Sequence, residues 1–125
     1  MNSEILTLFL ANCAKDPALQ DFARGRQLSF YYRLSNPDLE FFTVFAAGEV
    51  RTGLGKPAPE PDLTLQMTAE TFDEVMSGRT SAMAAAMSGR MRFSGDTTRA
   101  MSAQRIQNDL IRLYSEAKEA WYPAA

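Results

Sequence analysis

The amino-acid sequence predicts an α+β domain (α/β in the broad sense): one five-stranded mixed sheet with an N-terminal antiparallel meander and helices packed over one face. Three observations support this class. Residues 27–54 contain three successive strand-like segments: the first and third alternate in period two, and the second is apolar on both faces after its first residues. Residues 81–96 read as a small-residue helix, a glycine, a short strand and a Gly-Asp pair. Residues 96–121 form a long amphipathic helical segment. A chain of 125 residues fits a single domain, 1–125.

The N-terminal segment, residues 1–24, is predicted to be helical. Ser3 is a good cap for a first helix. That helix ends near Asp16, because the residue before a proline avoids the helical region. Pro17 is suited to open a second short helix, and Gly25 ends it.

These three segments predict strands over residues 27–34, 39–46 and 49–54, and the second is expected to be central in its sheet because both of its faces are apolar. Their connections, 35–38 and 47–48, are short and rich in turn residues. Consecutive strands joined by short turns read as an antiparallel meander.

A proline-rich connector, residues 55–61, separates the meander from a fourth strand that completes the sheet segment 27–67. Because proline cannot donate to a sheet, the connector is expected to be extended and at the surface. A helical insert over 68–88 follows, and then a fifth strand over 90–94. Asp96 caps the C-terminal helical region, which is expected to bend or break near Ser102.

Composition excludes several classes of function. Thirteen basic and fifteen acidic residues give a net charge of −2 and are dispersed, so no nucleic-acid partner is expected. The absence of histidine excludes His-based triads and metal sites, and no phosphate-binding glycine loop occurs. We therefore expect no enzyme, no metal and no cofactor. A single cysteine, Cys13, and the lack of a signal peptide or membrane span predict a cytoplasmic protein.

The order of the segments in the second half resembles the sterol carrier protein 2 family, the SCP2-like fold. The match is good over residues 62–101 and looser upstream to about Gln20. The segments that carry it are the strand and helix cap Pro61–Thr68, the helix with Phe72, Val75, Met76 and Gly78, the helix Ser81–Ser88, and the strand Gly89–Asp96. The resemblance implies a cavity between sheet and helices that holds a lipid or sterol-like molecule, and a fifth strand near the far side of the sheet.

Two sets of residues are candidates to line such a cavity. Methionines gather in the second half and are predicted to point inward, where they either fill gaps in the core or form a deformable pocket. Aromatic residues on the meander form either a packed core or a wall of the pocket, and Tyr32 and Tyr114 are placed to offer a hydroxyl there. The candidate ligand-binding residues are Phe30, Tyr32, Phe41, Phe45, Met83, Met87, Met91, Phe93, Met101, Ile106 and Leu110.

The favoured function is non-catalytic binding or carriage of an apolar small molecule, a lipid or acyl chain, by a monomer or homodimer with transient membrane or enzyme contacts. The alternative is a protein-interaction or accessory module without a ligand, which dimerises through Trp121 or assists an enzyme of lipid or quinone metabolism. Arg90 and Arg92 share one face of their strand, which is either a solvated face or an attractant for anionic lipids. The carboxylates Asp73 and Glu74 read as exposed.

Overall fold

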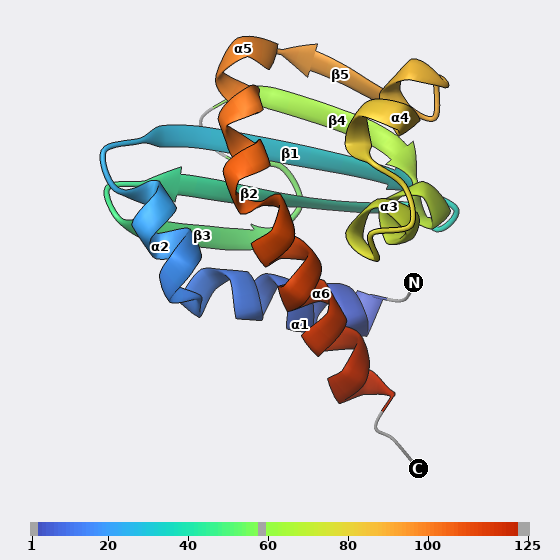
Figure 1. Ribbon diagram of the computed structural model, residues 1–125, viewed down its shortest axis with the longest axis horizontal. Helices are drawn as coiled ribbons and strands as arrows, with labels where there is room; N and C mark the ends of the chain where they lie inside the picture. The colour runs from blue at the N-terminus through green and yellow to red at the C-terminus, as the bar shows by residue number, and fades with distance from the viewer. Residues whose placement is uncertain (1–2, 58–59, 123–125) are drawn as a thin grey trace.

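A computed structural model describes residues 3–57 and 60–122, so residues 58–59 of the predicted connector lie outside the described part. Figure 1 shows one sheet accompanied by helices. The strands are β1 (Gln27–Ser35), β2 (Leu39–Ala46), β3 (Glu49–Leu54), β4 (Leu63–Thr68) and β5 (Met91–Gly95). The helices are α1 (Ser3–Lys15), α2 (Pro17–Ala23), α3 (Ala69–Met76), α4 (Ala82–Met87), α5 (Thr97–Ala100), the 3-10 helix η1 (Met101–Ile106) and α6 (Gln107–Trp121).

The sheet has the strand order β3-β2-β1-β4-β5. The pairs β3–β2, β2–β1 and β4–β5 are antiparallel, whereas β1 and β4 are parallel. The parallel pair needs a crossover, which the connector after β3 supplies. The predicted fold class, a mixed sheet with an N-terminal meander and a fifth strand at the far edge, is therefore confirmed.

Short polar side chains cap the starts of α2, α3, α4 and α5, and the sequence predicts two of these caps, Thr68 and Asp96. The carboxylate of Asp16 accepts the N–H of Leu19 at 3.2 Å, and Thr68 Oγ1 accepts the N–H of Thr71 at 3.0 Å. Ser81 caps α4 and Asp96 caps α5 in the same way. The start of each of these four helices is thereby fixed by its own sequence.

The C-terminal region is broken into three pieces. α5 has four residues and passes into η1, and α6 begins at Gln107 without a side-chain cap. The expected break near Ser102 is thus a 3-10 turn, a common connector between helices. α6 then packs against α1 and α3.

Asp62 joins the start of β4 to its neighbours on both sides. Its Oδ2 accepts the N–H of Ser29 at 2.8 Å, and its carbonyl oxygen accepts the N–H of Asp96 at 2.8 Å. Its Oδ1 also accepts a hydrogen bond from Arg99 at 2.8 Å. One residue therefore ties β1, β4 and the β5–α5 turn together.

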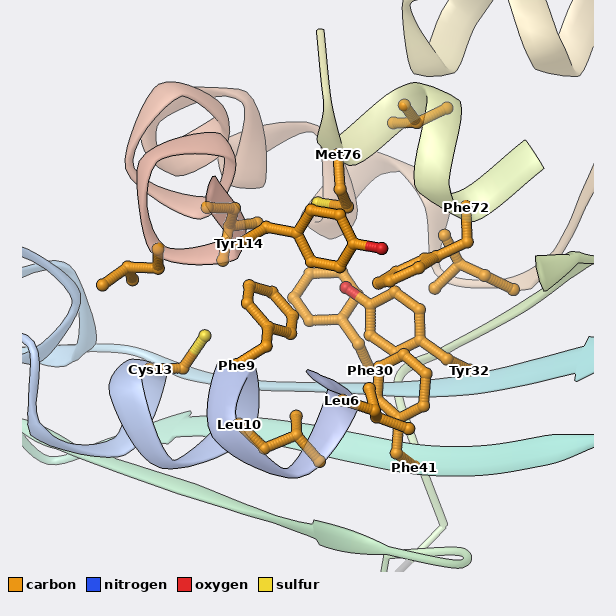
Figure 2. Close-up of a cluster of buried hydrophobic side chains, with 14 of the residues drawn as sticks. Leu6, Phe9, Leu10, Cys13, Phe30, Tyr32, Phe41, Phe72, Met76 and Tyr114 are labelled. Carbon is orange, nitrogen blue, oxygen red and sulfur yellow. The ribbon is translucent and has the colours of Figure 1, made fainter. Parts of the chain in front are cut away.

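The core occupies one face of the sheet, under the helices. Phe30 and Tyr32 of β1 are buried in it, while exposed Arg33 points to the opposite face, as period-two alternation requires. Tyr32 stacks on Phe41 with ring centroids 4.6 Å apart. Figure 2 shows these rings gathered with residues of α1, α3 and α6, namely Phe9, Phe72 and Tyr114.

Candidate ligand-binding cavity

A cavity of about 840 Å³ lies between the sheet and the helices α3, α4 and α6, and it opens to solvent. Its floor comes from the second half of the sheet. The floor residues are Phe30 and Tyr32 of β1, Leu63, Leu65 and Met67 of β4, and Met91 and Phe93 of β5. Its other walls include Phe72, Val75 and Met76 of α3, Met83, Ala86 and Met87 of α4, Met101 and Ala103 of η1, and Leu110 and Ile111 of α6.

The surface of the cavity is mainly apolar, and its polar side chains come from loops and helix ends. The polar lining residues are Arg79, Thr80, Ser81, Thr97, Gln104 and Gln107, and all of them are half-buried or exposed. A site of this size and composition suits an apolar guest with its polar end toward water.

Most of the candidate residues lie around this space. Those that line it are Phe30, Tyr32, Met83, Met87, Met91, Phe93, Met101 and Leu110. Three others do not: Phe41, Phe45 and Ile106 are buried in solid packing. Phe45 contacts Phe22 of α2 with ring centroids 5.3 Å apart, so α2 packs against β2 at this residue.

The prediction that the methionines point inward is wrong for three of them. Met67, Met76 and Met91 are buried, but Met83, Met87 and Met101 are exposed, and 83% of Met87 is accessible. These three nevertheless border the cavity. They form its rim, where a side chain touches both the hollow and solvent.

Part of the cavity wall comes from residues that were not among the candidates. The apolar side of α3, with Phe72, Val75 and Met76, faces the cavity as well as the core. Its spacing of three and four residues is the helical signal that identifies a buried face. Spacing alone does not say whether the face meets side chains or an open space.

An ion-pair cluster holds α3 to α6 beside the cavity. The hydroxyl of Tyr114 donates to Asp73 Oδ1 at 2.6 Å, and Lys118 Nζ donates to the same oxygen at 3.1 Å. Arg79 Nη2 lies 2.6 Å from Asp73 Oδ2. Asp73 is therefore a structural residue rather than a solvated one, which corrects the sequence-based interpretation.

The ion-pair cluster shifts the pKa values of Asp73 and Tyr114 in opposite directions. Burial alone would raise the pKa of Asp73, but hydrogen bonds from Tyr114 and Lys118, with the charges of Lys118 and Arg79, outweigh it and lower that pKa. Burial and the bond to Asp73 raise the pKa of Tyr114. The Tyr114 hydroxyl is thus committed to Asp73, and Tyr114 does not offer it to the cavity.

Tyr32 is the buried phenol on the cavity floor. Burial raises its pKa, the nearby Cys13 thiol raises it further, and the hydroxyl of Thr43 partly offsets both. Thr43 Oγ1 itself is fully buried and has no hydrogen bond within normal geometry among the described residues. Tyr32 therefore stays a neutral phenol in an apolar layer.

Arg90, which precedes β5, and Arg92, which lies within it, do not line the cavity. Arg90 donates to Glu74 at 3.0 Å, and Arg92 borders a polar cleft of about 500 Å³ that Arg33 and Gln66 also line. Arg92 pairs in register with Gln66, which pairs with Arg33, so the three side chains share the sheet face that lacks the cavity. Within the described residues, no group of three or more acidic or cysteine side chains could hold a metal ion, and no helix is both long and apolar enough to span a bilayer.

Comparisons with known proteins agree with this architecture. A crystal structure of sterol carrier protein 2 superposes with a TM-score of 0.65 at 18% identity, covering 88% of this chain and 92% of that one. The UbiJ-SCP2 ubiquinone synthesis protein superposes with a TM-score of 0.56 at 18% identity, covering 92% and 93%. These likenesses concern the fold.

Sequence relatives lie within longer proteins. Human hydroxysteroid dehydrogenase-like protein 2 is 25% identical over 97 residues, which is 77% of this chain but only 23% of that protein. The chain thus spans about a quarter of the length of this curated relative. The sequence model of the SCP-2 sterol transfer family matches residues 6–108, and the chain belongs to that family.

Proposed function

We propose that the protein binds an apolar ligand, a lipid or acyl chain, in the cavity between sheet and helices without transforming it. The observation that carries the proposal is a hollow of about 840 Å³ whose floor is built from apolar strand residues. Binding sites for small molecules fall in this size range. Membership of a sterol transfer family supports the same class of ligand.

The lining suits the acyl chain better than a polar substrate. Burying one methylene contributes about 0.8 kcal/mol, so ten of them contribute about 8 kcal/mol before the cost of ordering the chain. Methionine side chains from α4, β5 and η1 adapt to guests of different shape. Affinity can therefore come from burial, with no strong polar anchor.

Filling the cavity tests the proposal. Ala86 lines the cavity and is half-buried, whereas Ala84, two residues earlier on α4, is exposed and does not line it. Ala86→Phe is expected to weaken uptake of a monomeric fluorescent fatty acid at least about tenfold, because the ring takes the space of the chain. Ala84→Phe places the same ring in solvent and is expected to leave uptake unchanged.

Both variants should keep the far-UV circular dichroism of the parent protein. If Ala86→Phe does not fold, Ala86→Leu gives the same test with a smaller side chain. Equal uptake by the Ala86 and Ala84 variants, or no uptake by the parent, would contradict a ligand cavity.

An accessory role is the second candidate, and the comparisons favour it specifically. Similar proteins include hydroxysteroid dehydrogenase-like protein 2, in which the similar region is 23% of the length, and, by fold, the UbiJ-SCP2 ubiquinone synthesis protein. A domain of this kind presents an apolar molecule to an enzyme. Native mass spectrometry separates the roles: a co-purifying lipid supports carriage, and an empty dimer supports a purely structural module.

A further inference from the structure

The fifth strand, β5, forms an open edge of the sheet. The strand order β3-β2-β1-β4-β5 gives it a strand partner, β4, on one side only. Figure 1 shows no other described strand or helix running along its outer side. The unpaired N–H and C=O groups of an edge strand can pair with a second strand, and proteins usually cover or disrupt such an edge. β5 is therefore a surface that a further strand could extend.

The hydrogen-bond pattern indicates which backbone groups of β5 are free. The N–H of Asp96 donates to the carbonyl oxygen of Asp62 at 2.8 Å, so Asp96 faces β4. In an antiparallel pair, residues that exchange hydrogen bonds alternate with residues that do not. Arg92 and Ser94 therefore face β4 in the same way, and the N–H and C=O groups of Phe93 between them point to the open edge.

On the cavity side, this edge is flanked by exposed apolar side chains. Phe93 lies in β5 itself, Met87 ends α4 shortly before β5, and Met101 starts η1 directly after α5. All three are exposed, and all three line the cavity. Free backbone groups and free apolar side chains thus occur together on one strand and its flanks.

Arg92 is the exposed charge of β5 on the opposite face of the sheet. It forms no ion pair with the residues that the structure describes. Arg90, just before the strand, is paired with Glu74, and Arg99, just after it, is paired with Asp62. The Arg92 guanidinium is therefore the charge that limits which strand can pair here, and in which register.

We infer that β5 pairs with β5 of a second copy of this chain, antiparallel and centred on Phe93. In this register Phe93 exchanges two backbone hydrogen bonds with the partner's Phe93, and the whole strand overlaps. Arg92 then lies opposite the partner's Ser94, whereas a register centred on Arg92 would set two guanidiniums against each other. The same residues meet in both directions, as a two-fold interface requires.

The pairing joins two five-stranded sheets edge to edge, with both cavities on the same face. Because the strands are antiparallel, the end of β5 that leads into α5 lies beside the end of the partner's β5 that follows α4. Met101 thereby approaches the partner's Met87, and Phe93 on the cavity floor gains the partner's Phe93 as a neighbour. Each copy contributes residues to the border of the other's cavity. This inference goes beyond ligand binding and does not depend on it.

Sedimentation velocity, from micromolar to submillimolar protein, tests the pairing, and a concentration-dependent dimer is expected. Ser94→Lys places a lysine opposite the partner's Arg92 on both sides of the axis and is expected to weaken the dimer about tenfold. Arg92→Glu/Ser94→Lys is expected to restore it, because the exchanged charges attract each other. Ser94→Glu is expected to tighten the dimer several-fold. The control Arg51→Glu makes the same charge change on β3, at the other edge of the sheet, and is expected to have no effect.

Two further measurements locate the interface. The N–H of Phe93 is expected to exchange with solvent more slowly as the protein concentration rises, whereas the N–H of Asp96 is already bonded to Asp62 and should not respond. Met87→Ser is expected to weaken the dimer several-fold. Leu54→Ser removes an exposed apolar side chain from the end of β3 and is expected to leave the dimer unchanged.

A protein that stays monomeric at the highest concentration, or a dimer that Ser94→Lys does not weaken, would overturn the inference. A loss that Arg92→Glu/Ser94→Lys fails to restore would overturn the register. Uptake of monomeric fluorescent fatty acid by the same samples separates this inference from the proposed function. A dimer paired through β5 that takes up no fatty acid contradicts the ligand cavity alone, and a monomer that takes it up contradicts the pairing alone.

Discussion

The hydroxyl of Tyr114 on α6 donates a hydrogen bond of 2.6 Å to the carboxylate of Asp73 on α3. Tyr114 is buried, and its ring contacts Phe72 and Phe9 edge-on. Lys118, one turn further along α6, donates to the same carboxylate oxygen. The two helices beside the cavity are therefore held by a directed polar contact as well as by apolar packing.

Tyr114→Phe should lower the free energy of unfolding by about 1–3 kcal/mol. The variant keeps the ring and its packing but removes a hydrogen bond to a charged group. Urea denaturation measures the loss. Tyr122→Phe, which removes the hydroxyl of an exposed residue, should change stability by less than about 0.5 kcal/mol, and a similar loss in both variants would refute the role of the Asp73 bond.

The sheet was predictable from sequence because alternation reports directly on which side of a strand is buried. The segment at Gln27 alternates clearly, the segment at Leu39 is apolar on both faces, and the structure places the two strands next to each other as expected. The helix starts were predictable because Thr68 and Asp96 are local signals whose partners lie three residues away. Contacts of this range need no knowledge of the tertiary fold.

The candidate site was less predictable because alternation does not tell which helix covers which part of a face. Phe41 and Phe45 share the helix-covered face with Phe30, yet Phe72 of α3 packs edge-on against Phe41 and Phe22 of α2 packs edge-on against Phe45. α4 has six residues rich in alanine, too short for a period to distinguish an inward Met87 from a rim residue. The Asp73 cluster could not be predicted from the sequence for another reason, because its partner Tyr114 lies 41 residues from Asp73 along the chain.

The pH dependence of stability should report on Asp73. Its pKa is lower in the folded protein than the ordinary value of 3.8, so the unfolded state takes up the proton first as the pH falls. The stability from this carboxylate is complete above about pH 5 and is lost as the pH falls below about 4 toward the folded pKa. Asp73→Asn should therefore be less stable than the parent protein at about pH 7 and lose less further stability on acidification.

Urea midpoints measured at intervals between about pH 3 and pH 7, at constant ionic strength, give the two curves. Asp21→Asn is a suitable control, because Asp21 forms a long ion pair of 3.8 Å with Arg24 and both side chains are exposed. Parallel curves for the parent and Asp73→Asn would show that the carboxylate does not contribute in this way.

Gly95, at the end of β5, is expected to be intolerant of a side chain. Its φ is +116°, and a Cβ there would collide with the carbonyl oxygen of Asp62. Gly95→Ala should cost at least about 3 kcal/mol, because the backbone of β4 would have to move. Gly89→Ala should cost only about 1–2 kcal/mol, since Gly89 has a φ of +80° but no atom within 4 Å of the added Cβ.

Thermal or urea unfolding gives the ranking of the two glycine variants, and hydrogen exchange locates the damage. The N–H of Asp96, bonded to the Asp62 carbonyl at 2.8 Å, should exchange faster in Gly95→Ala than in Gly89→Ala. Equal destabilisation with equal exchange would mean that the backbone conformation alone sets the cost at both positions.

Cys13 should be unreactive in the native protein. It is fully buried on α1, and burial, with the charge of Asp16, raises its pKa to about 12 against a partial opposing effect of Arg112. At about pH 8 the thiolate would be about one molecule in ten thousand even if a reagent could reach it. A disulfide reagent should therefore label Cys13 only through unfolding, rapidly in denaturant and faster in Gly95→Ala than in the parent protein. The raised pKa also predicts that stability falls as the pH rises above about 9, because the unfolded thiol then loses its proton first. Labelling of the native protein at the rate of a free peptide thiol would show that α1 opens without global unfolding.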